Sequence, residues 1–465
     1  MYKLLAAPLV LIALSACSQV GPLEVQASYP SADFDLWYDT PGGKKILEDT
    51  ELTADTCYNI FSETDDVRLD GEAPESVEFF LYDGAWRRVN VESKTPYDYG
   101  RAGTCDAFAP GTYRILQRVS YAGEKRDSKT SFTVVAPQSA DIYVSTAGSD
   151  SNDGLTSTTA FKTINKAAQV VRAGETVSVA PGVYRESVVS SASGTADERI
   201  RFVSERRHGA VVDADGNYTA WRNNGSYVDI VGFEVTRADY LGIYNRGSHV
   251  SIAGNHVHHL GVPACTDDGG AGILHGNYDA SDNEVIGNLV HDILPPQSCN
   301  KVHGIYVSDL RTKVQNNIVH GTGGWGIHTW HYADELTISN NLVTNNAQGG
   351  IIIGGGSEVA DGFTVTNNIA TNNRYGIREY GQTGTNRYEN NLVYGNSPED
   401  DIALKGNTHR GTLFADPLLV KAGDEHRFGS GSPAADAGVA LGAPPTDYDG
   451  EVRTEPFDVG PFDLQ

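Results

Sequence analysis

Short runs of alternating apolar and polar residues fill the first third of the chain. From Ala27 to Pro137 runs such as VEFFLYDG and GTYRILQRVSYAG alternate with a period of two and are separated by turn residues. Because successive side chains of a strand point to opposite faces, this pattern predicts short antiparallel strands with one buried face. We expect residues 27–137 to form a small β-sandwich.

The remainder of the chain repeats two kinds of residue at fixed places. An asparagine and a Gly-Ile pair recur in turn, at intervals of 22 to 33 residues, and one interval per coil is typical of a solenoid. The asparagines are Asn255, Asn288, Asn317, Asn341, Asn368 and Asn391, and the isoleucines are Ile243, Ile273, Ile305, Ile327, Ile351 and Ile377. We expect each isoleucine to point into the core and each asparagine to bond the backbone of the next coil. The residue after each isoleucine should then point outward.

Both ends of this repeat region resemble a known architecture. The opening segment, DIYVSTAGSDSNDGLTSTTAFKTINKAAQVV, and the closing segments FADPLLV and GSGSPAADAG resemble those of secreted right-handed parallel β-helix proteins of the pectate-lyase-like kind. The resemblance covers roughly residues 141–463 and implies that residues 160–171 form a capping helix. It implies an all-β fold with a right-handed parallel β-helix over residues 138–465. Many different chemistries occur on this scaffold, so it does not specify the activity.

The preceding residues, 27–137, are similar in the order of their strands to the Ig-like modules attached to secreted bacterial enzymes. The expected role of such a module is that of a spacer or cap, with direct glycan binding as the alternative.

The first residues have the pattern of an export signal. Lys3 precedes the apolar run LLAAPLVLIAL, which ends in LSAC, and this order is typical of a signal peptide. LSAC resembles a bacterial lipobox, which implies that residues 1–17 form a lipoprotein signal, that Cys17 carries the lipid and that residues 18–26 are a linker. Ser18 then favours the outer membrane. We expect an exported protein held to the bacterial outer membrane by its lipid alone, because no later run is long and apolar enough to span a bilayer.

Four further cysteines predict two disulfides, since an exported chain with an even number of remaining cysteines is expected to pair them. Pairing by domain gives Cys57–Cys105 and Cys265–Cys299. Cys265 and Cys299 lie in the two longest intervals of the repeat, in equivalent loops of neighbouring coils, and adjacent strands lie about 5 Å apart. Such a disulfide would hold a wall beside the strand face. The spacing of the cysteines does not favour zinc.

The net charge of the chain is −25, which excludes nucleic acid as an expected partner. An acidic polysaccharide would need a local basic surface or bridging cations. Asp267 and Asp268, beside Cys265, are candidate calcium ligands because calcium prefers carboxylate oxygens. The alternative is that they are solvated loop acids. Calcium is therefore the one candidate cofactor, and we expect a monomer.

Histidine is concentrated in one region, with ten of the thirteen between His249 and His331. His258, His291 and His320 each follow a ladder asparagine by three places. Stacked on successive coils, the outer two would be about 10 Å apart, too far for one zinc ion. This column predicts stacked turns in preference to a metal site.

The outward positions of the Gly-Ile strands are the candidate active site. Neighbouring coils offer Tyr306, His328 and Arg378, with Trp330 two places beyond His328 and Tyr380 two places beyond Arg378. Aromatic faces, an imidazole and a guanidinium suit a sugar chain and an acid–base reaction. The alternative is a solvated sheet face with scattered aromatics. The other candidates are His303 as a catalytic group and Arg246, His275, Lys301 and His331 as substrate-binding groups.

Two reaction classes are weighed for this strip. A lyase needs a base and a cation beside a uronate carboxylate, whereas a glycoside hydrolase needs two carboxylates at a defined separation. The strip has few carboxylates, which favours a polysaccharide lyase that cleaves an acidic glycan by β-elimination. His328 or Tyr306 would serve as base and acid, and Arg378 would neutralise the carboxylate. A glycoside hydrolase on a neutral or weakly charged polysaccharide and a non-enzymatic surface glycan-binding or adhesion protein remain open alternatives.

Overall fold

The computed structural model describes two separate parts of the chain. In the first part it describes residues 36–40, 43–47, 50–53, 60–62, 74–82, 86–92, 97–98, 111–121 and 124–135. In the second part it describes residues 140–463 apart from 267–268, 296–298, 398–400, 430 and 451. The chain divides into two compact units, Met1–Gln138 and Ser139–Gln465, next to the expected boundary. The expected lipid site Cys17 and the expected Cys57–Cys105 disulfide lie outside the described residues.

The described residues of the first unit form two β-sheets, as the period-two alternation predicts. One has the strand order β2-β1-β4-β7 and the other the order β3-β9-β8-β5-β6. All pairings are antiparallel except that of β3 with β9. Ile115 and Phe132 lie in the core of this unit. That this unit is Ig-like stays a prediction. Its strands are β1 (Trp37–Thr40), β2 (Gly43–Ile46), β3 (Thr50–Thr53), β4 (Ile60–Ser62), β5 (Ser76–Tyr82), β6 (Trp86–Glu92), β7 (Tyr97–Asp98), β8 (Gly111–Tyr121) and β9 (Glu124–Val135).

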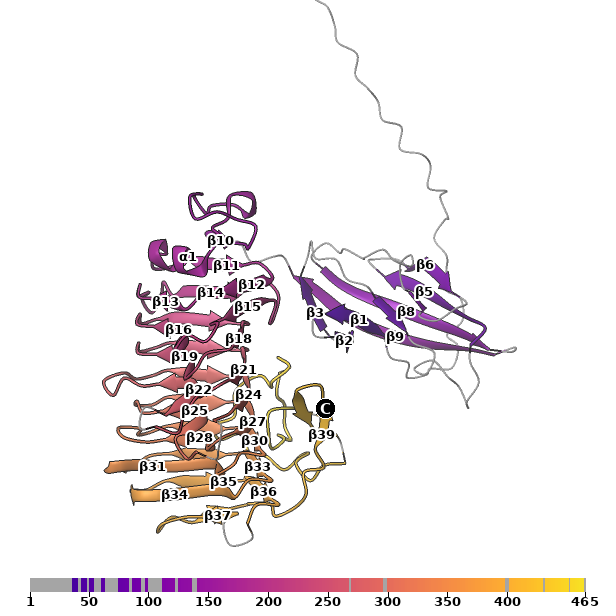
Figure 1. The fold of residues 1–465 in the computed structure, drawn as a ribbon. Helices are drawn as coiled ribbons and strands as arrows, with labels where there is room; N and C mark the ends of the chain where they lie inside the picture. The colour runs from indigo at the N-terminus through magenta and orange to yellow at the C-terminus, as the bar shows by residue number, and fades with distance from the viewer. Residues whose placement is uncertain are drawn as a thin grey trace, which may run out of the picture. The chain divides into compact units, whose positions relative to one another are not determined.

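The second unit is a parallel β-helix whose coils each add one strand to three parallel sheets (Figure 1). The first sheet contains β10 (Ile142–Val144), β11 (Thr176–Val179), β14 (Ile200–Ser204), β17 (Val228–Val231), β20 (Ser251–Ala253), β23 (Glu284–Ile286), β26 (Lys313–Gln315), β29 (Thr337–Ser339), β32 (Thr364–Thr366), β35 (Arg387–Glu389) and β38 (His409–Arg410).

The second sheet contains β12 (Gly182–Arg185), β15 (Ala210–Asp213), β18 (Glu234–Thr236), β21 (His256–Leu260), β24 (Leu289–Ile293), β27 (Ile318–Thr322), β30 (Leu342–Thr344), β33 (Ile369–Thr371) and β36 (Leu392–Tyr394). The third sheet contains β13 (Val188–Ser190), β16 (Thr219–Asn223), β19 (Leu241–Asn245), β22 (Gly270–His275), β25 (Val302–Val307), β28 (Trp325–Thr329), β31 (Gly349–Ala360), β34 (Tyr375–Thr383) and β37 (Ile402–Ala403).

A short helix covers the first coil. The 3₁₀ turn η1 (Ser157–Thr159) leads to α1 (Ile164–Val170), and the hydroxyl of Thr163 accepts a hydrogen bond from the backbone N–H of Lys166 at 3.1 Å. This is an ordinary N-cap. Ile164 and Ala167 are buried against the core, so α1 closes the apolar end of the solenoid. The expected capping helix is confirmed, although it is shorter than residues 160–171. Within the described part of the chain, none of the helices has the length and apolar character that a bilayer crossing requires.

The core of the solenoid follows the two predicted columns. All six isoleucines of the Gly-Ile pairs are fully buried, and neighbouring members lie in register, as in Ile305 with Ile327. The asparagines form a ladder, but each side chain bonds the backbone of the preceding coil and not, as expected, that of the next coil. Oδ1 of Asn341 accepts from the backbone N–H of Asn317 at 3.0 Å, and Nδ2 of Asn341 donates to the side-chain Oδ1 of Asn368 at 2.9 Å. The repeat therefore fixes both the core and its polar spine.

The C-terminal segment lies along the second sheet. Its strands β39 (Val420–Ala422) and β40 (Glu425–Arg427) pair with each other. Phe428, Tyr448 and Phe462 form an apolar cluster with outward leucines and isoleucines of β24, β27, β30 and β33. This segment thus covers part of the second sheet.

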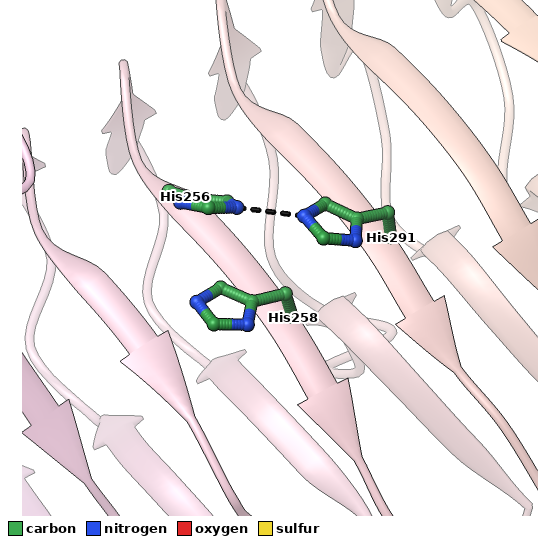
Figure 2. A group of neighbouring side chains, drawn as sticks. All are labelled: His256, His258 and His291. Carbon is green, nitrogen blue, oxygen red and sulfur yellow. Dashed lines mark hydrogen bonds between the residues drawn. The ribbon is translucent and has the colours of Figure 1, made fainter. Parts of the chain in front are cut away.

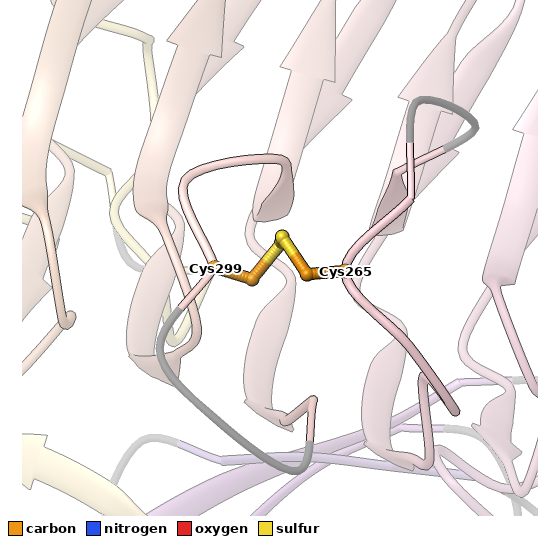
Figure 3. The surroundings of a disulfide bond; sticks show 2 residues. All are labelled: Cys265 and Cys299. Carbon is orange, nitrogen blue, oxygen red and sulfur yellow. A yellow bond between two sulfur atoms is a disulfide. The ribbon is translucent and has the colours of Figure 1, made fainter.

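A disulfide joins two coils beside the third sheet (Figure 3). Cys265 lies in the loop between β21 and β22, and Cys299 lies in the loop between β24 and β25, with Cα atoms 5.6 Å apart. The predicted Cys265–Cys299 pairing is confirmed.

Candidate active site on the third sheet

The strand register brings the predicted outward residues into one column. Tyr306 of β25 is paired with His328 of β28, His328 with Ile352 of β31, and Ile352 with Arg378 of β34. Each follows a buried isoleucine, so alternation turns its side chain away from the core. The structure therefore places Tyr306 and His328 on adjacent strands, with Arg378 two strands further on. We call Tyr306, His328, Trp330, Arg378 and Tyr380 the outward strip.

His328 is surrounded by aromatic rings. Its imidazole stacks on that of His303 with ring centroids 4.1 Å apart, and meets the ring of Tyr306 edge to face at 4.7 Å. Trp330 lies on another side at 5.5 Å. His328 is half-buried, and its Nδ1 is buried without a hydrogen-bond partner among the described residues. Such a ring is held in place by packing alone.

Burial determines the protonation of these groups. Together with the neighbouring His303 and His331 imidazoles, it holds the pKa of His328 well below its ordinary value. Burial also lowers the pKa of His303 to about 3, and Nδ1 of that ring accepts a hydrogen bond from the backbone N–H of Trp325 at 3.3 Å. Desolvation disfavours the charged form of an imidazole, so both rings are neutral near pH 7.

Tyr306 is shifted in the opposite sense for the same reason. Burial and, as a smaller effect, the nearby Tyr278 raise the pKa of its hydroxyl above the ordinary value. Because desolvation disfavours the phenolate, Tyr306 keeps its proton. A neutral imidazole that can accept a proton therefore lies in contact with a phenol that can donate one.

Glycine makes room for the aromatic part of the outward strip. A Cβ atom at Gly354 would lie 2.5 Å from the ring of Trp330, and one at Gly356 would lie 2.9 Å from it. The indole therefore lies flat over the backbone of β31 and reaches Tyr380, with ring centroids 5.7 Å apart. Tyr380 is 51% exposed. Trp330 and Tyr380 thus form an aromatic platform that begins at His328.

Arg378 joins the outward strip through aromatic contacts. Its guanidinium lies 4.3 Å from the ring centroid of Tyr375 and 6.0 Å from that of Tyr380. Ile352 lies between Arg378 and His328 in the register, and it is only 5% exposed. The structure therefore places the cation at the far end of the platform from the imidazole.

Four residues around the outward strip were not predicted. Tyr375 lies beneath Arg378, and Lys405 has its Nζ 5.9 Å from the ring centroid of Tyr380. Tyr278 and Tyr332 are both exposed, and their rings meet at a tilt of 39° with centroids 5.1 Å apart. Lys405 lies two places after Ala403, which pairs with Arg378, so the same outward rule could have found it. The two tyrosines lie in turns, where alternation gives no direction.

One predicted binding residue is in the interior. His275, expected as a substrate-binding group, ends β22 and is fully buried. Its Nδ1 lies 3.3 Å from Nδ2 of Asn245 and 3.4 Å from a carboxylate oxygen of Asp309. It follows outward Leu274 by one place, so alternation turns it inward, and it belongs to a polar ladder in the core. The expectation that it touches substrate is wrong.

Of the other predicted binding residues, His331 is a neighbour of His328 in the outward strip, whereas Arg246 and Lys301 are not members of that strip. Arg246 is exposed just beyond β19, and Lys301 is exposed just before β25, where its carbonyl accepts a hydrogen bond from the N–H of Gly270. His331 follows Trp330 and lies 4.9 Å from the ring of Tyr278. The candidate calcium ligands, Asp267 and Asp268, lie outside the described residues.

The predicted stacking of the histidine column is confirmed, but its members lie on strands β21, β24 and β27 of the second sheet and not in turns. The ring centroids of His258 and His291 are 5.3 Å apart, and those of His291 and His320 are 4.8 Å apart. Side chains with metal-ligand spacing gather beside this column in two sets, His256 with His258 and His291, and His259 with His291 and Asp292.

The family of the chain follows from its β-helix region. The model of the Pel9A-like, right-handed β-helix region matches residues 142–409. The chain belongs to the Pel9A-like right-handed β-helix family. This membership confirms the predicted right-handed parallel β-helix.

Single proteins resemble this Pel9A-like chain only at low sequence identity. The crystal structure of pectate lyase Pel9A has a TM-score of 0.49 and 19% identity, covering 70% of this chain and 96% of that one. XylC in complex with xylose has a TM-score of 0.41 and 12% identity, covering 60% and 70%. The uncharacterized protein YwoF of Bacillus subtilis (strain 168) is 28% identical over 146 residues. That match covers 28% of this chain and 31% of YwoF, so the chain spans about a third of that relative.

Proposed function

We propose that this protein cleaves an acidic, uronate-containing polysaccharide by β-elimination at the outward strip. The observation that carries the proposal is the contact between His328 and Tyr306, whose rings lie 4.7 Å apart and whose pKa values are shifted in opposite directions. One can accept a proton and the other can donate one, as an elimination requires.

The reaction needs one proton to leave and one to be delivered. His328 accepts the proton of the carbon next to the uronate carboxylate, and that C–H electron pair forms a carbon–carbon double bond. The bond to the 4-linked sugar oxygen breaks, and Tyr306 donates its proton to that oxygen. The products are an unsaturated uronate end and a new reducing end.

The positive charge needed by an acidic glycan comes from the far end of the outward strip. Arg378 and Lys405 both lie against Tyr380, while the chain as a whole has a net charge of −25. A polyanion laid on Trp330 and Tyr380 would place carboxylates of neighbouring sugars next to these two cations. We assign Arg378 to binding the glycan at a sugar away from the cleaved bond, because Ile352 separates Arg378 from His328.

The same positions oppose the hydrolase alternative. From Tyr244 to Tyr380 the two outward columns of the third sheet contain no aspartate or glutamate. A glycoside hydrolase requires a pair of carboxylates on either side of the bond that it cleaves. The outward strip instead provides an imidazole, a phenol and a guanidinium.

The test is incubation with a panel of uronate and neutral polysaccharides, following ultraviolet absorbance of unsaturated ends together with reducing sugar. A lyase produces both signals on a uronate polymer. Reducing ends without absorbance would establish a hydrolase, and binding without either signal would establish a glycan-binding protein.

Variants of the outward strip assign the roles. His328→Gln and Tyr306→Phe should each lower kcat by about 10²- to 10⁴-fold, the range that general acid–base groups contribute. Arg378→Gln should mainly raise KM. Arg374→Gln is the matched control, since Arg374 also lies over Tyr375, at 5.1 Å, but is not part of the outward strip. Full activity of folded His328→Gln would place the reaction elsewhere.

A further inference from the structure

A second cluster of side chains lies on the outer face of the second sheet, separate from the outward strip. His256 and His258 are both outward on β21, on either side of the buried Val257, and His291 is outward on β24 after the buried Val290. His258 and His291 are paired in register. His256 lies two residues before His258 on the same strand, and its ring also reaches His291 (Figure 2). Three imidazoles from two adjacent coils therefore meet.

We propose that His256, His258 and His291 bind one divalent transition-metal ion, with zinc as the expected ion. One ring nitrogen from each residue lies within 4.8 Å of those of the other two. Imidazole nitrogen is a preferred ligand of zinc, and three protein ligands leave the fourth tetrahedral position for water or another ligand. His256 and His258 are half-buried, so the site can be reached from solvent.

The distance between the His256 and His291 rings is that expected when a hydrogen bond, and not a metal ion, lies between them. Nε2 of His256 lies 2.7 Å from Nε2 of His291, which is a hydrogen bond between two imidazoles. Two nitrogens on a tetrahedral zinc ion lie about 3.3 Å apart, because each is about 2.0–2.1 Å from the metal. Small rotations of the side chains open this gap, and the ion takes the place of the bridging proton.

Acidic side chains orient two of the three rings. Nδ1 of His291 lies 2.8 Å from a carboxylate oxygen of Asp292, and Nε2 of His258 lies 3.2 Å from one of Glu234. A carboxylate that accepts a hydrogen bond from one ring nitrogen leaves the lone pair on the other and strengthens it as a ligand. In His291 that arrangement directs the Nε2 lone pair toward His256. Glu234, on β18, bonds Nε2 of His258 and so leaves Nδ1 of that ring as the ligand. That Nδ1 lies 2.6 Å from Nδ1 of the exposed His259, and the ion would take the place of this contact as well.

A neighbouring arrangement competes for the same ion. His259, His291 and Asp292 also have ligand atoms within 4.8 Å of one another, but His259 is exposed and Nε2 of its ring is 3.9 Å from Asp292. The proposal assigns the ion to His256 because that set consists of three imidazoles, two of them with carboxylate partners. Substitutions of His256 and His259 therefore distinguish the two arrangements.

The experiment uses the full chain without a histidine tag, stripped with a chelator and titrated with zinc chloride in a calorimeter. We expect one ion per chain. His256→Gln and His291→Gln should each weaken binding by at least about 100-fold, because loss of an outer-shell partner alone costs 10- to 100-fold. Asp292→Asn should weaken it less than either ligand substitution.

Two controls keep the result interpretable. His259→Asn, at an exposed residue with a φ of 51° that asparagine tolerates, should leave binding intact, as should His409→Gln, far along the chain on β38. The absorption spectrum of the cobalt(II) form checks the wild type independently and should show the intense bands of a tetrahedral site. Absence of saturable zinc binding by folded wild type, binding that survives His256→Gln, or loss through His259→Asn alone would each overturn the proposal.

Discussion

His328 shows how its surroundings alter an ordinary side chain. Its ring is enclosed by His303, Tyr306 and Trp330, and no carboxylate is among its ring contacts. Desolvation therefore acts without compensation and lowers the pKa. A neutral imidazole is available at every pH near neutrality, and a bound uronate carboxylate would raise its proton affinity within the complex.

The pH dependence of cleavage follows from this shift. A base works in its deprotonated form, so its contribution to activity is lost as the pH falls through the pKa of His328. Since that pKa is below the ordinary value of about 6.5, the acid limb of kcat/KM, which reports the free enzyme, should lie below pH 6.5. The acid limb of kcat should lie at a higher pH than that of kcat/KM, because the bound uronate carboxylate favours the protonated form of His328. Initial rates across pH would contradict this assignment if kcat/KM were already half lost at pH 6.5.

At the scale of elements, the disulfide links two loops that precede strands of the third sheet. Cys265 and Cys299 are 34 residues apart in the chain, and Cys299 is buried with the core while Cys265 is exposed. The bond therefore fastens a surface loop to a buried position on the next coil. Lys301 and Gly270 pair through their backbones beside it, so the disulfide stabilises the start of β22 and β25.

Removing this link should destabilise the protein. Closing a loop of 34 residues restricts the unfolded chain by about 4 kcal/mol in the chain-entropy model. We expect Cys265→Ser to lower the free energy of unfolding by about 2–4 kcal/mol, measured by urea denaturation. Adding reductant to the Cys265→Ser variant should not destabilise the β-helix any further, because the Cys265–Cys299 bond is already absent. Equal stability of the variant and the oxidised wild type would contradict this prediction.

At the scale of the whole molecule, the asparagine ladder connects coils that otherwise contact only their neighbours. Oδ1 of Asn341 accepts from the backbone N–H and from Nδ2 of Asn317, at 3.0 and 2.9 Å. Its Nδ2 donates to the carbonyl of Val314 at 2.8 Å and to Asn368. Each rung thus satisfies buried groups on the coils before and after it, and repeat proteins owe their cooperativity to such interfaces between repeats.

Breaking one rung should cost more than an ordinary surface substitution. Asn341→Ala leaves buried donors and an acceptor without partners, and each costs about 1–3 kcal/mol. We expect a loss of about 3 kcal/mol or more in the free energy of unfolding, by chemical denaturation. Asn345→Gly is the control, because Asn345 is exposed and its φ of 54° suits glycine. A cost of less than about 1 kcal/mol for Asn341→Ala would show that the ladder is not needed for stability.

Some features were predictable because a repeat fixes them. The isoleucine core, the asparagine ladder, the Cys265–Cys299 pairing and the outward register from Tyr306 to Arg378 all follow from a constant coil and a strand period of two. The stacked column of His258, His291 and His320 follows for the same reason. The sequence disfavours metal in that column because His258 and His320 are too far apart for one ion. His256 is not part of the column, and only the structure shows that it meets His291 diagonally.

The sequence by itself therefore determined the architecture and which positions face outward, since both depend only on backbone periodicity. Only the tertiary structure decided which outward side chains touch. Rotamers and neighbouring rings place Arg378 over Tyr375, Trp330 over the Gly354 backbone and His256 against His291. They also determine which groups are desolvated, and hence that His328 is a neutral base beside a protonated Tyr306. Contacts and burial depend on packing across coils, which a period along one chain does not specify.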